Sequence, residues 1–312
     1  MTIQSIQAPG AVVMMRPHRF QPNPETAADN TFQRSTGESG AMAASAIAQA
    51  ARDEVTAAAA RLEAAGVRVH LFDDAGERQT PDSVFPNNWF STHPGGRIAL
   101  YPMYSPNRRR ERRHDVIDML KAQYRVQDVI DYSGLEHDGV FLEGTGAMVL
   151  DHIAHVAYVA RSHRADPVAL ERFCTHFNFE PMVFDTADAA GRAIYHTNVM
   201  MCVATGFAMV GFDLMTDSKR RAQVRARLEE SGRCVIALAT SQIEAFAGNA
   251  IELSGSQGRV LALSERAAAS LTSAQRTEIA KSAQLLPLAV PTIELAGGSV
   301  RCMLAGIHLA RR

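Results

Sequence analysis

The sequence predicts an α/β protein in which five strand and helix units close into a ring. Short β-like runs pair across Gly-containing turns, and each pair is followed by a helical stretch and another short apolar strand. The residues that open these pairs are separated by 58, 53, 53 and 53 positions, and they are Phe85, Glu143, His196, Asn249 and Cys302. A fixed period of about 50 residues is typical of a radial or solenoidal array, and closure removes exposed strand edges.

Four of the units can be followed along the chain. Their predicted hairpins pair Trp89–His93 with Ile98–Tyr101, Ala147–Leu150 with Val156–Ala160, Val199–Ala204 with Phe207–Phe212, and Ala250–Leu253 with Val260–Leu263. The helices expected after these hairpins are Arg108–Gln123, Pro167–Phe177, Ser218–Ser231 and Thr272–Ala283. Strands such as Val126–Ile130 and Val235–Leu238 are expected to follow the helices.

The fifth unit is predicted to combine both ends of the chain. An Ala-rich helix over Ala41–Ala65 is stopped by Gly66 and followed by a strand at Val67–Phe72. Its hairpin would have to pair Ala11–Met15 with Ser299–Ala305. Because the first and last segments share one unit, we expect a single domain over residues 1–312.

Composition favours a small molecule as the partner. With 312 residues, 46% of them hydrophobic, the chain can bury a large core. Lys and Arg number 32 against 33 Asp and Glu, so the net charge of -1 indicates neither nucleic acid nor an anionic membrane as a partner. No stretch reaches the roughly 18 apolar residues that span a bilayer, and the cytoplasm is the expected location.

The four cysteines must be considered one at a time. Cys174, Cys202, Cys234 and Cys302 are widely separated and form no C-x-x-C pair, which argues against a disulfide framework or a zinc site. The first three lie within apolar helix or strand runs and are expected to be structural. Cys302 differs because it lies at the position of its unit that polar residues occupy in the other units.

Equivalent positions of a ring converge on its axis, so five polar residues are expected to line one pocket. They are Asn87, Glu143, His196, Asn249 and Cys302. A thiolate attacks a poorly electrophilic carbon better than water does, and an imidazole can move protons near neutral pH. We therefore expect Cys302 to be the nucleophile and His196 the acid and base, with Glu143 orienting the imidazole or holding a substrate N–H.

These residues lie in segments that resemble the guanidine-modifying superfamily, which includes arginine deiminases, dimethylarginine hydrolases, succinylarginine dihydrolases and amidinotransferases. The segments are FPNNW (85–89), LEGTG (142–146), YHTN (195–198), GNA (248–250) and VRCM (300–303). A further segment, RPHRFQPNPETAADNTFQ (16–33), is similar to bacterial citrulline-utilisation hydrolases. The resemblance implies a five-bladed, pentein-like α/β propeller of ββαβ units, a Cys-His-Glu catalytic set, and no metal or organic cofactor.

Two positions depart from the arginine-processing relatives. Those relatives carry acidic residues at the end of an E-G-G-D motif and two residues after the catalytic His, where this chain has Gly146 and Asn198. Hydrogen bonds to a charged group are worth about 1.5 to 3 kcal/mol each, so the loss of two carboxylates disfavours a guanidinium substrate. Amides supply both donors and acceptors, which favours a neutral ureido compound such as citrulline. Asp82 and Glu143 keep a guanidinium possible.

Several other residues are candidates for substrate binding. Asp82 could accept substrate N–H groups, while Asn87 and Asn88 could either bind substrate or make turn hydrogen bonds. Arg16 and Arg301 could each bind a substrate carboxylate through two hydrogen bonds. The polar segment Arg16–Ser39 is expected to be a lid, because loops longer than about 12 to 15 residues are usually functional or disordered. The run RRRERR at 108–113 is interpreted as a solvated face or a subunit contact in a possible homo-oligomer.

Two other functions remain open. An amidinotransferase would use the same covalent intermediate but release it to an amine instead of water, and the sequence does not separate these reactions. A non-catalytic binding protein is the alternative from another class, as in the ribosome-binding translation factors that share the expected fold. Retention of Cys302, His196 and Glu143 together argues against that reading.

Overall fold

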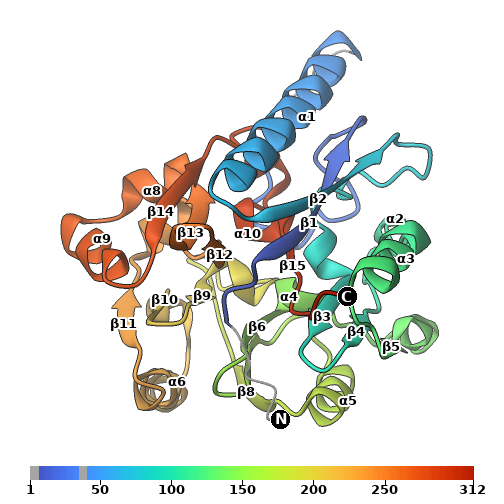
Figure 1. Ribbon diagram of the computed structural model, residues 1–312. Helices are drawn as coiled ribbons and strands as arrows, with labels where there is room; N and C mark the ends of the chain where they lie inside the picture. Colours follow the sequence, from blue (N-terminus) through green and yellow to red (C-terminus); the bar gives the residue numbers. More distant parts are fainter. Residues whose placement is uncertain (1–6, 35–40) are drawn as a thin grey trace.

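Five separate three-stranded sheets form the framework of the computed structural model, which describes residues 7–34 and 41–312 (Figure 1). Each in strand order, the sheets are β15 (Ala305–Gly306), β1 (Ala11–Pro17) and β2 (Arg68–Asp74); β3 (Phe90–His93), β4 (Arg97–Leu100) and β5 (Asp128–Asp131); β6 (Met148–Asp151), β7 (Val156–Ala160) and β8 (Glu180–Phe184); β9 (Met201–Val203), β10 (Phe207–Val210) and β11 (Cys234–Ala237); and β12 (Ile251–Gly255), β13 (Gly258–Ser264) and β14 (Gln284–Leu288). The first strand of each sheet runs antiparallel to the middle strand, and the third runs parallel to it. The predicted α/β fold with repeated small sheets is confirmed.

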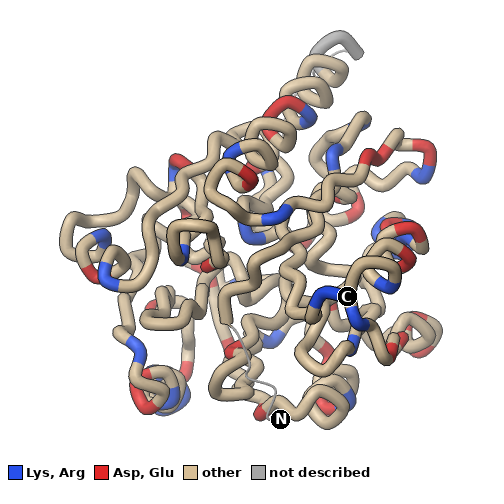
Figure 2. The backbone as a smooth tube through the Cα atoms, in the orientation of Figure 1, with Lys and Arg blue, Asp and Glu red and all other residues tan. Residues whose placement is uncertain are grey.

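Helices connect the middle strand of each sheet to its parallel third strand, as a parallel crossover requires. In chain order the helices are α1 (Ala41–Ala64), α2 (Pro106–Arg109), α3 (His114–Gln123), α4 (Gly144–Ala147), α5 (Pro167–Phe177), α6 (Ser218–Glu230), α7 (Thr240–Glu244), α8 (Glu265–Ser270), α9 (Ser273–Ala280) and α10 (Val300–Met303). The 3-10 turns are η1 (Pro86–Asn88), η2 (Ser133–Asp138), η3 (Thr197–Val199), η4 (Phe212–Leu214) and η5 (Ile293–Ala296). Figure 1 shows α1, α3, α5, α6 and α9 at the periphery, and Figure 2 shows many of the charged residues on these outer segments.

The two ends of the chain meet in one sheet, as the sequence predicts. Strand β1 pairs in parallel with β2 and antiparallel with β15, in a register that puts Val12 opposite both Val69 and Gly306. The predicted strand Ser299–Ala305 is wrong over most of its length, because residues 300–303 form α10 instead. The first turn of α10 forms because the N–H groups of Cys302 and Met303 donate to the carbonyl of Ser299 at 3.0 and 3.3 Å.

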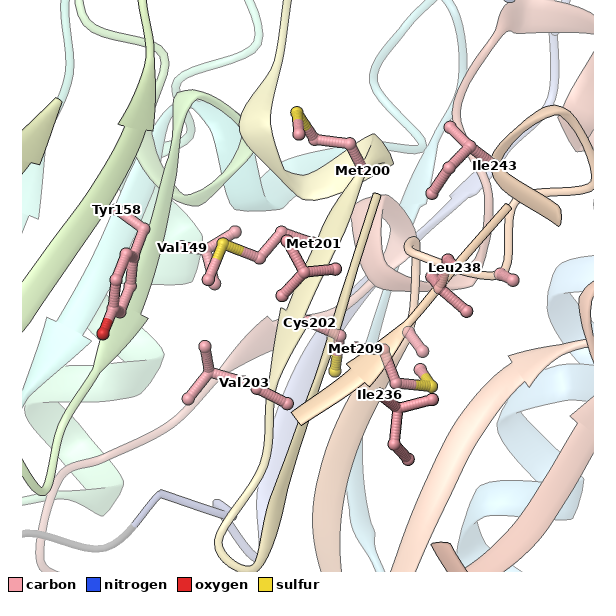
Figure 3. Close-up of a cluster of buried hydrophobic side chains, with 14 of the residues drawn as sticks. Val149, Tyr158, Met200, Met201, Cys202, Val203, Met209, Ile236, Leu238 and Ile243 are labelled. Atoms are coloured by element: carbon pink, nitrogen blue, oxygen red, sulfur yellow. The ribbon is translucent and has the colours of Figure 1, made fainter. Parts of the chain in front are cut away.

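The largest hydrophobic cluster among the described residues joins the third, fourth and fifth sheets. Figure 3 shows Val149 and Tyr158 on one side and Met201, Val203 and Met209 on the other. All three residues of β9 are buried, as are all four of β6. Strands that are buried on both faces read as continuous apolar runs without alternation, which is why these strands were visible in the sequence.

Two of the predicted helices have other bounds in the structure. The expected helix Arg108–Gln123 is split into α2 and α3, because Arg108 turns inward and its Nε and Nη2 donate to Glu111 at 2.9 Å each. The expected helix Thr272–Ala283 is the shorter α9, which Thr272 caps by accepting the N–H of Gln275. No helix in the described part of the chain is long and apolar enough to cross a bilayer.

Candidate active site

Short helical turns at the starts of the innermost strands carry the candidate site residues. Asn87 and Asn88 lie in η1, Glu143 is the N-cap of α4, and His196 is the N-cap of η3. Cys302 is the third residue of α10. The turns that carry these residues precede β3, β6, β9 and β15, so the candidate residues sit at the same end of four sheets.

Glu143 and His196 form a buried pair. His196 Nε2 lies 2.8 Å from Glu143 Oε2, and their side chains are 2% and 0% exposed. An ionised carboxylate only accepts hydrogen bonds, so the ring proton resides on Nε2 and Nδ1 carries a free lone pair. The backbone N–H of Tyr104 donates to the other Glu143 oxygen at 3.0 Å. Glu143 therefore fixes both the tautomer and the orientation of the imidazole.

The surrounding charges set the protonation of this pair. Burial lowers the pKa of His196 to about 4, even though the hydrogen bond and charge of Glu143 oppose the shift. Burial alone would raise the pKa of Glu143, but Arg164, His196 and Arg108 together hold it well below its ordinary value. At neutral pH the pair is therefore a carboxylate and a neutral imidazole, which can accept a proton.

Two amide side chains contact the sulfur of Cys302. Asn198 Nδ2 lies 3.3 Å and Asn249 Nδ2 3.2 Å from Sγ. Asn249 is fixed in this orientation because its Oδ1 accepts the backbone N–H of Arg301 at 3.1 Å, while its Nδ2 also donates to the carbonyl of Asn198 at 3.0 Å. Donors aimed at sulfur stabilise negative charge on it. The side-chain oxygen of Asn198 is buried, and no described residue donates a hydrogen bond to it.

Asp82 and Asn88 belong to the same layer of buried polar side chains as Glu143 and His196. Asp82 Oδ2 accepts from Asn23 at 2.8 Å, whereas its Oδ1 is buried and has no hydrogen-bond partner in the described part of the chain. Burial raises the pKa of Asp82, against the opposing charge of Arg108. Oriented to satisfy its neighbours, the amide of Asn88 accepts from Arg108 at 3.0 and 3.1 Å and donates to Asn87 at 3.2 Å.

Two buried arginines next to Glu143 were missed by the sequence reasoning. Arg164 Nη1 lies 3.3 Å and Arg108 Nη1 3.7 Å from Glu143 Oε2. Their side chains are only 1% and 3% exposed. The interpretation of 108–113 as a solvated face or subunit contact is wrong for Arg108 and Glu111, both buried beside the site. The run of arginines at 108–113 singles out Arg108 in the sequence, whereas no local pattern indicates that Arg164 belongs to the site.

A strap formed by residues 18–34, between β1 and α1, covers this layer. Besides the contact of Asn23 with Asp82, the strap places Asp29 against Arg164, with oxygen to nitrogen distances of 2.5 and 3.0 Å. Asn30 donates to the carbonyl of Ala296 at 3.0 Å. The predicted lid therefore contacts the site through Asn23 and Asp29, while its residues 35–39 lie outside the described part of the chain.

The structure does not bring the guanidinium groups of Arg16 and Arg301 to the sulfur. Arg16 is held at the surface by Asp73, whose two oxygens lie 2.7 and 2.8 Å from its nitrogens. The guanidinium of Arg301 donates to the carbonyl of Leu304 at 2.9 Å and lines a different cavity. That either one binds a substrate carboxylate stays a prediction, which requires Arg16 to leave Asp73 or Arg301 to turn from Leu304. Of the cysteines, Cys174 and Cys202 are buried as expected, but Cys234 is exposed.

Gly146 has no room for a side chain. A Cβ atom there would lie 2.8 Å from His196 Nδ1 and would also overlap the side-chain amide of Asn88. Gly144 has φ of +44°, and a Cβ would approach the carbonyl of Asn87 at 2.6 Å. These two glycines let α4 pack against η1 and η3. Among the described residues, no three His, Cys, Asp or Glu side chains are grouped so that they could hold a metal ion.

Solved structures of three other proteins share the fold. The N-terminal domain of ArgZ, an arginine dihydrolase from the ornithine-ammonia cycle in cyanobacteria, was solved with bound substrate; it is 14% identical over 95% of this chain and 97% of its own, with a TM-score of 0.70. AgrE with L-arginine is 15% identical over 97% of this chain and 40% of its own, with a TM-score of 0.71. Dimethylarginine dimethylaminohydrolase in an adduct with S-methyl-L-thiocitrulline is 12% identical over 97% and 99%, with a TM-score of 0.59. The chain spans 40% of full-length ArgZ.

The shared fold and the family match place the chain in the pentein superfamily of guanidine-modifying enzymes. The sequence profile described as N,N dimethylarginine dimethylhydrolase, eukaryotic, matches residues 16–309, and the chain belongs to that family of cysteine-dependent guanidino hydrolases. A comparison with curated proteins finds no match.

Proposed function

We propose that the protein hydrolyses a C–N bond of a ureido or guanidino compound, with citrulline or a near relative as the preferred substrate. Cys302 is the nucleophile, His196 the acid and base, and Glu143 the residue that orients His196. The observation that carries this proposal is the environment of the sulfur, which consists of the neutral amides of Asn198 and Asn249.

The reaction proceeds in two halves. The thiol of Cys302 loses its proton to the neutral imidazole, and the thiolate attacks the planar carbon to form a tetrahedral adduct. The imidazolium returns this proton to the departing nitrogen, the C–N bond breaks, and a thio-linked intermediate remains. Water then attacks the same carbon while His196 accepts its proton, and the C–S bond breaks to restore the thiol. Glu143 stabilises the positive imidazolium in both halves.

The charges near the sulfur favour a neutral substrate group. A guanidinium would need carboxylate partners, but Glu143 is already engaged by His196 and Arg164. An amide can donate to a ureido oxygen or accept from a ureido N–H, and Asn198 keeps an unpartnered buried oxygen for the latter. A buried cation without hydrogen-bonding partners costs more free energy than a buried neutral group without them.

The remaining polar groups suit the ends of an amino acid. We propose that Asp82, through its unpartnered oxygen, accepts the α-ammonium group, and that Arg164 binds the α-carboxylate in place of Asp29. The strap then acts as a lid, because its contact with Arg164 must break before the α-carboxylate can bind there. The nearly complete burial of Cys302, at 2% exposure, supports a requirement for such opening.

We further propose that the five sheets form one catalytic domain with the architecture of a five-bladed propeller. Contacts between successive units support closure, since β15 meets β3, β6 meets β9, β9 meets β12, and α10 returns to β13. Glycine-bearing α4 links the second and third units through β3 and η1. A closed ring explains why turns separated by more than fifty residues share one polar layer.

The test is to incubate purified protein with citrulline, arginine, dimethylarginine, succinylarginine and agmatine, and to measure ammonia together with the carbon-containing products. We expect turnover of citrulline or another ureido compound, and none in Cys302→Ser. Failure of all five compounds with folded protein would contradict the proposal. Adding a primary amine, such as glycine, distinguishes the amidinotransferase alternative, because transfer would yield an amidino or carbamoyl adduct of that amine.

A further inference from the structure

A second cavity, of about 50 Å³, lies among the innermost strands and is separate from the candidate active site. Its wall is built from the first strand of all five sheets, namely β3, β6, β9, β12 and β15. Figure 3 shows part of this wall, where Val149 lies beside Met201 and Val203. Cys302, His196 and Glu143 do not contribute to its lining. We call it the inner cavity.

Arg301 brings an uncompensated positive charge to the inner cavity. Its Nη1 donates to the carbonyl of Leu304 at 2.9 Å, and within the described residues its other guanidinium N–H groups have no acceptor. No carboxylate of the described residues lies within ion-pair distance of it. Burial lowers the pKa of Arg301, although the group remains a cation at any ordinary pH. A buried charge without a partner is costly, and such charges are usually paired with an ion of opposite sign.

The other polar groups of the inner cavity do not supply the missing negative charge. His152 is 6% exposed, stacks on His308 with ring centroids 3.9 Å apart, and has a buried Nδ1 that no described residue contacts by a hydrogen bond. The one carboxylate in the lining, Glu252, accepts the backbone N–H of Thr205 at 2.7 Å and pairs with Arg259 at 3.2 Å. The charge of Glu252 is therefore compensated outside the cavity.

We propose that the inner cavity is a binding site for a small monovalent inorganic anion of the halide class, held by Arg301 and by His152. The volume fits this ligand, because a water needs roughly 10 to 15 Å³ measured in this way and the cavity offers a few times as much. A guanidinium donates readily to anions, and an imidazole nitrogen that carries its proton can add a second donor.

The position of this site connects it to the nucleophile. Arg301 directly precedes Cys302 in α10, and its backbone N–H donates to Asn249 Oδ1 at 3.1 Å. Asn249 in turn donates to the sulfur of Cys302 at 3.2 Å. An anion that neutralises Arg301 therefore stabilises the turn that presents the thiol.

The first test is thermal unfolding of the full chain in sodium gluconate, with chloride or bromide substituted at constant ionic strength. Gluconate is too large for the cavity, so only a specific site responds to the exchange. We expect a saturable rise in Tm of roughly 2 °C or more, because a ligand that binds only the folded state stabilises it. A Tm that does not change, or that changes linearly without saturation, overturns the proposal.

Variants test whether Arg301 is responsible for the rise in Tm. Arg301→Gln should abolish the saturable rise, whereas Arg301→Lys, which keeps the charge, should retain part of it. Arg225→Gln removes the same charge from exposed α6 and should respond like wild type, since its side chain is 42% exposed. A full response in folded Arg301→Gln would contradict the assignment. If Arg301→Gln does not fold, Arg301→Lys and the wild-type measurement below decide.

Crystals of the wild-type protein soaked in sodium bromide provide the direct measurement. We expect an anomalous bromide peak inside the inner cavity, next to the guanidinium of Arg301. Ordered water alone at this place, with bromide only on the outer surface, would exclude the site. This readout requires no turnover, so it stands or fails independently of the proposed hydrolase activity.

Discussion

His196 donates its Nε2 proton to Glu143 at 2.8 Å, so its opposite ring nitrogen is left as the free base. That nitrogen lies close to Gly146, where an added Cβ would come within 2.8 Å of it. The carboxylate and the glycine therefore act together. One fixes the tautomer, and the other determines where the ring can lie.

Replacing Gly146 with Ala should inactivate the enzyme without removing any reactive group. The new Cβ would lie 2.8 Å from His196 Nδ1, so the ring must move, and a displacement of about 1 Å can cost on the order of 100-fold in rate. We expect kcat to fall by at least about tenfold, measured with the best substrate. Gly134→Ala is the matched control, because a Cβ there has nothing within 4 Å. Equal activity of both variants would show that His196 needs no fixed position.

Substitution of the two reactive groups should abolish turnover while the fold survives. Cys302→Ser and His196→Ala each remove one member of a unit whose members act together, so either change should leave less than about a tenth of the activity. Circular dichroism and Tm verify folding. Activity that persists above this level in either variant contradicts the assigned role.

Alkylation should identify Cys302 once the exposed thiol is removed. Cys234 is exposed and would consume reagent first, so the experiment uses Cys234→Ser protein. Iodoacetamide should then modify Cys302 faster than Cys174 and Cys202, because burial raises the pKa of each of these two thiols to about 12. Mass mapping gives the site. A product carrying label on Cys174 or Cys202 but none on Cys302 would count against a nucleophilic role.

The protein should lose stability as the pH falls from 7 to 5. Burial lowers the pKa of His93 and His152 well below the ordinary value and that of His196 to about 4. Below about pH 6.5 the unfolded chain binds protons at these positions and the folded chain does not, so stability decreases with decreasing pH. We expect Tm to drop over this interval, and His152→Asn to show a smaller drop. An identical drop in His152→Asn would mean that other groups cause it.

Asp29 should compete with a substrate carboxylate for Arg164. Its two oxygens lie 2.5 and 3.0 Å from the guanidinium nitrogens, so binding of an α-carboxylate requires their displacement. Asp29→Asn should therefore lower KM about threefold or more for an α-amino acid substrate. A matched substrate without the carboxylate should show no such gain. An increase in KM for the amino acid would indicate that Asp29 serves mainly to hold the strap closed.

The repeat in the sequence predicted the five units because each unit needs a similar chain length to complete two strands, a helix and a return strand. It did not predict the local conformation. Glu143 and His196 are N-caps of their turns, whereas Cys302 is the third residue of α10. Residues that are spaced by 53 positions therefore occupy different places within their turns. These places depend on the backbone hydrogen bonds, which the spacing does not indicate.

The polar partners of the site were harder to predict than the catalytic residues. Burial of Arg164 depends on Asp29 and Glu143, which are 135 and 21 positions away, so no local pattern marks it. Arg16 was expected at the site but pairs with Asp73, because β1 and β2 run in parallel and place the two residues in register. The repeat and the composition of the sequence indicate which segments are equivalent. They do not indicate which charged side chains pair in the folded chain.

The last prediction concerns substrate charge and rests on Asn198, whose amide nitrogen contacts the sulfur of Cys302 at 3.3 Å. If the pocket suits a neutral group, citrulline should have a kcat/KM about tenfold or more above that of arginine, corresponding to roughly 1.4 kcal/mol of differential transition-state binding. Asn198→Asp should narrow or invert this ratio, because the new carboxylate attracts a guanidinium and must lose its hydration when a ureido group binds. Asn198→Ala removes the same donor without adding charge, and it should lower both rates without favouring arginine. Preference of the wild-type protein for arginine or a methylated arginine would mean that Asp82 and Glu143, despite their present partners, provide the charge that holds the cation.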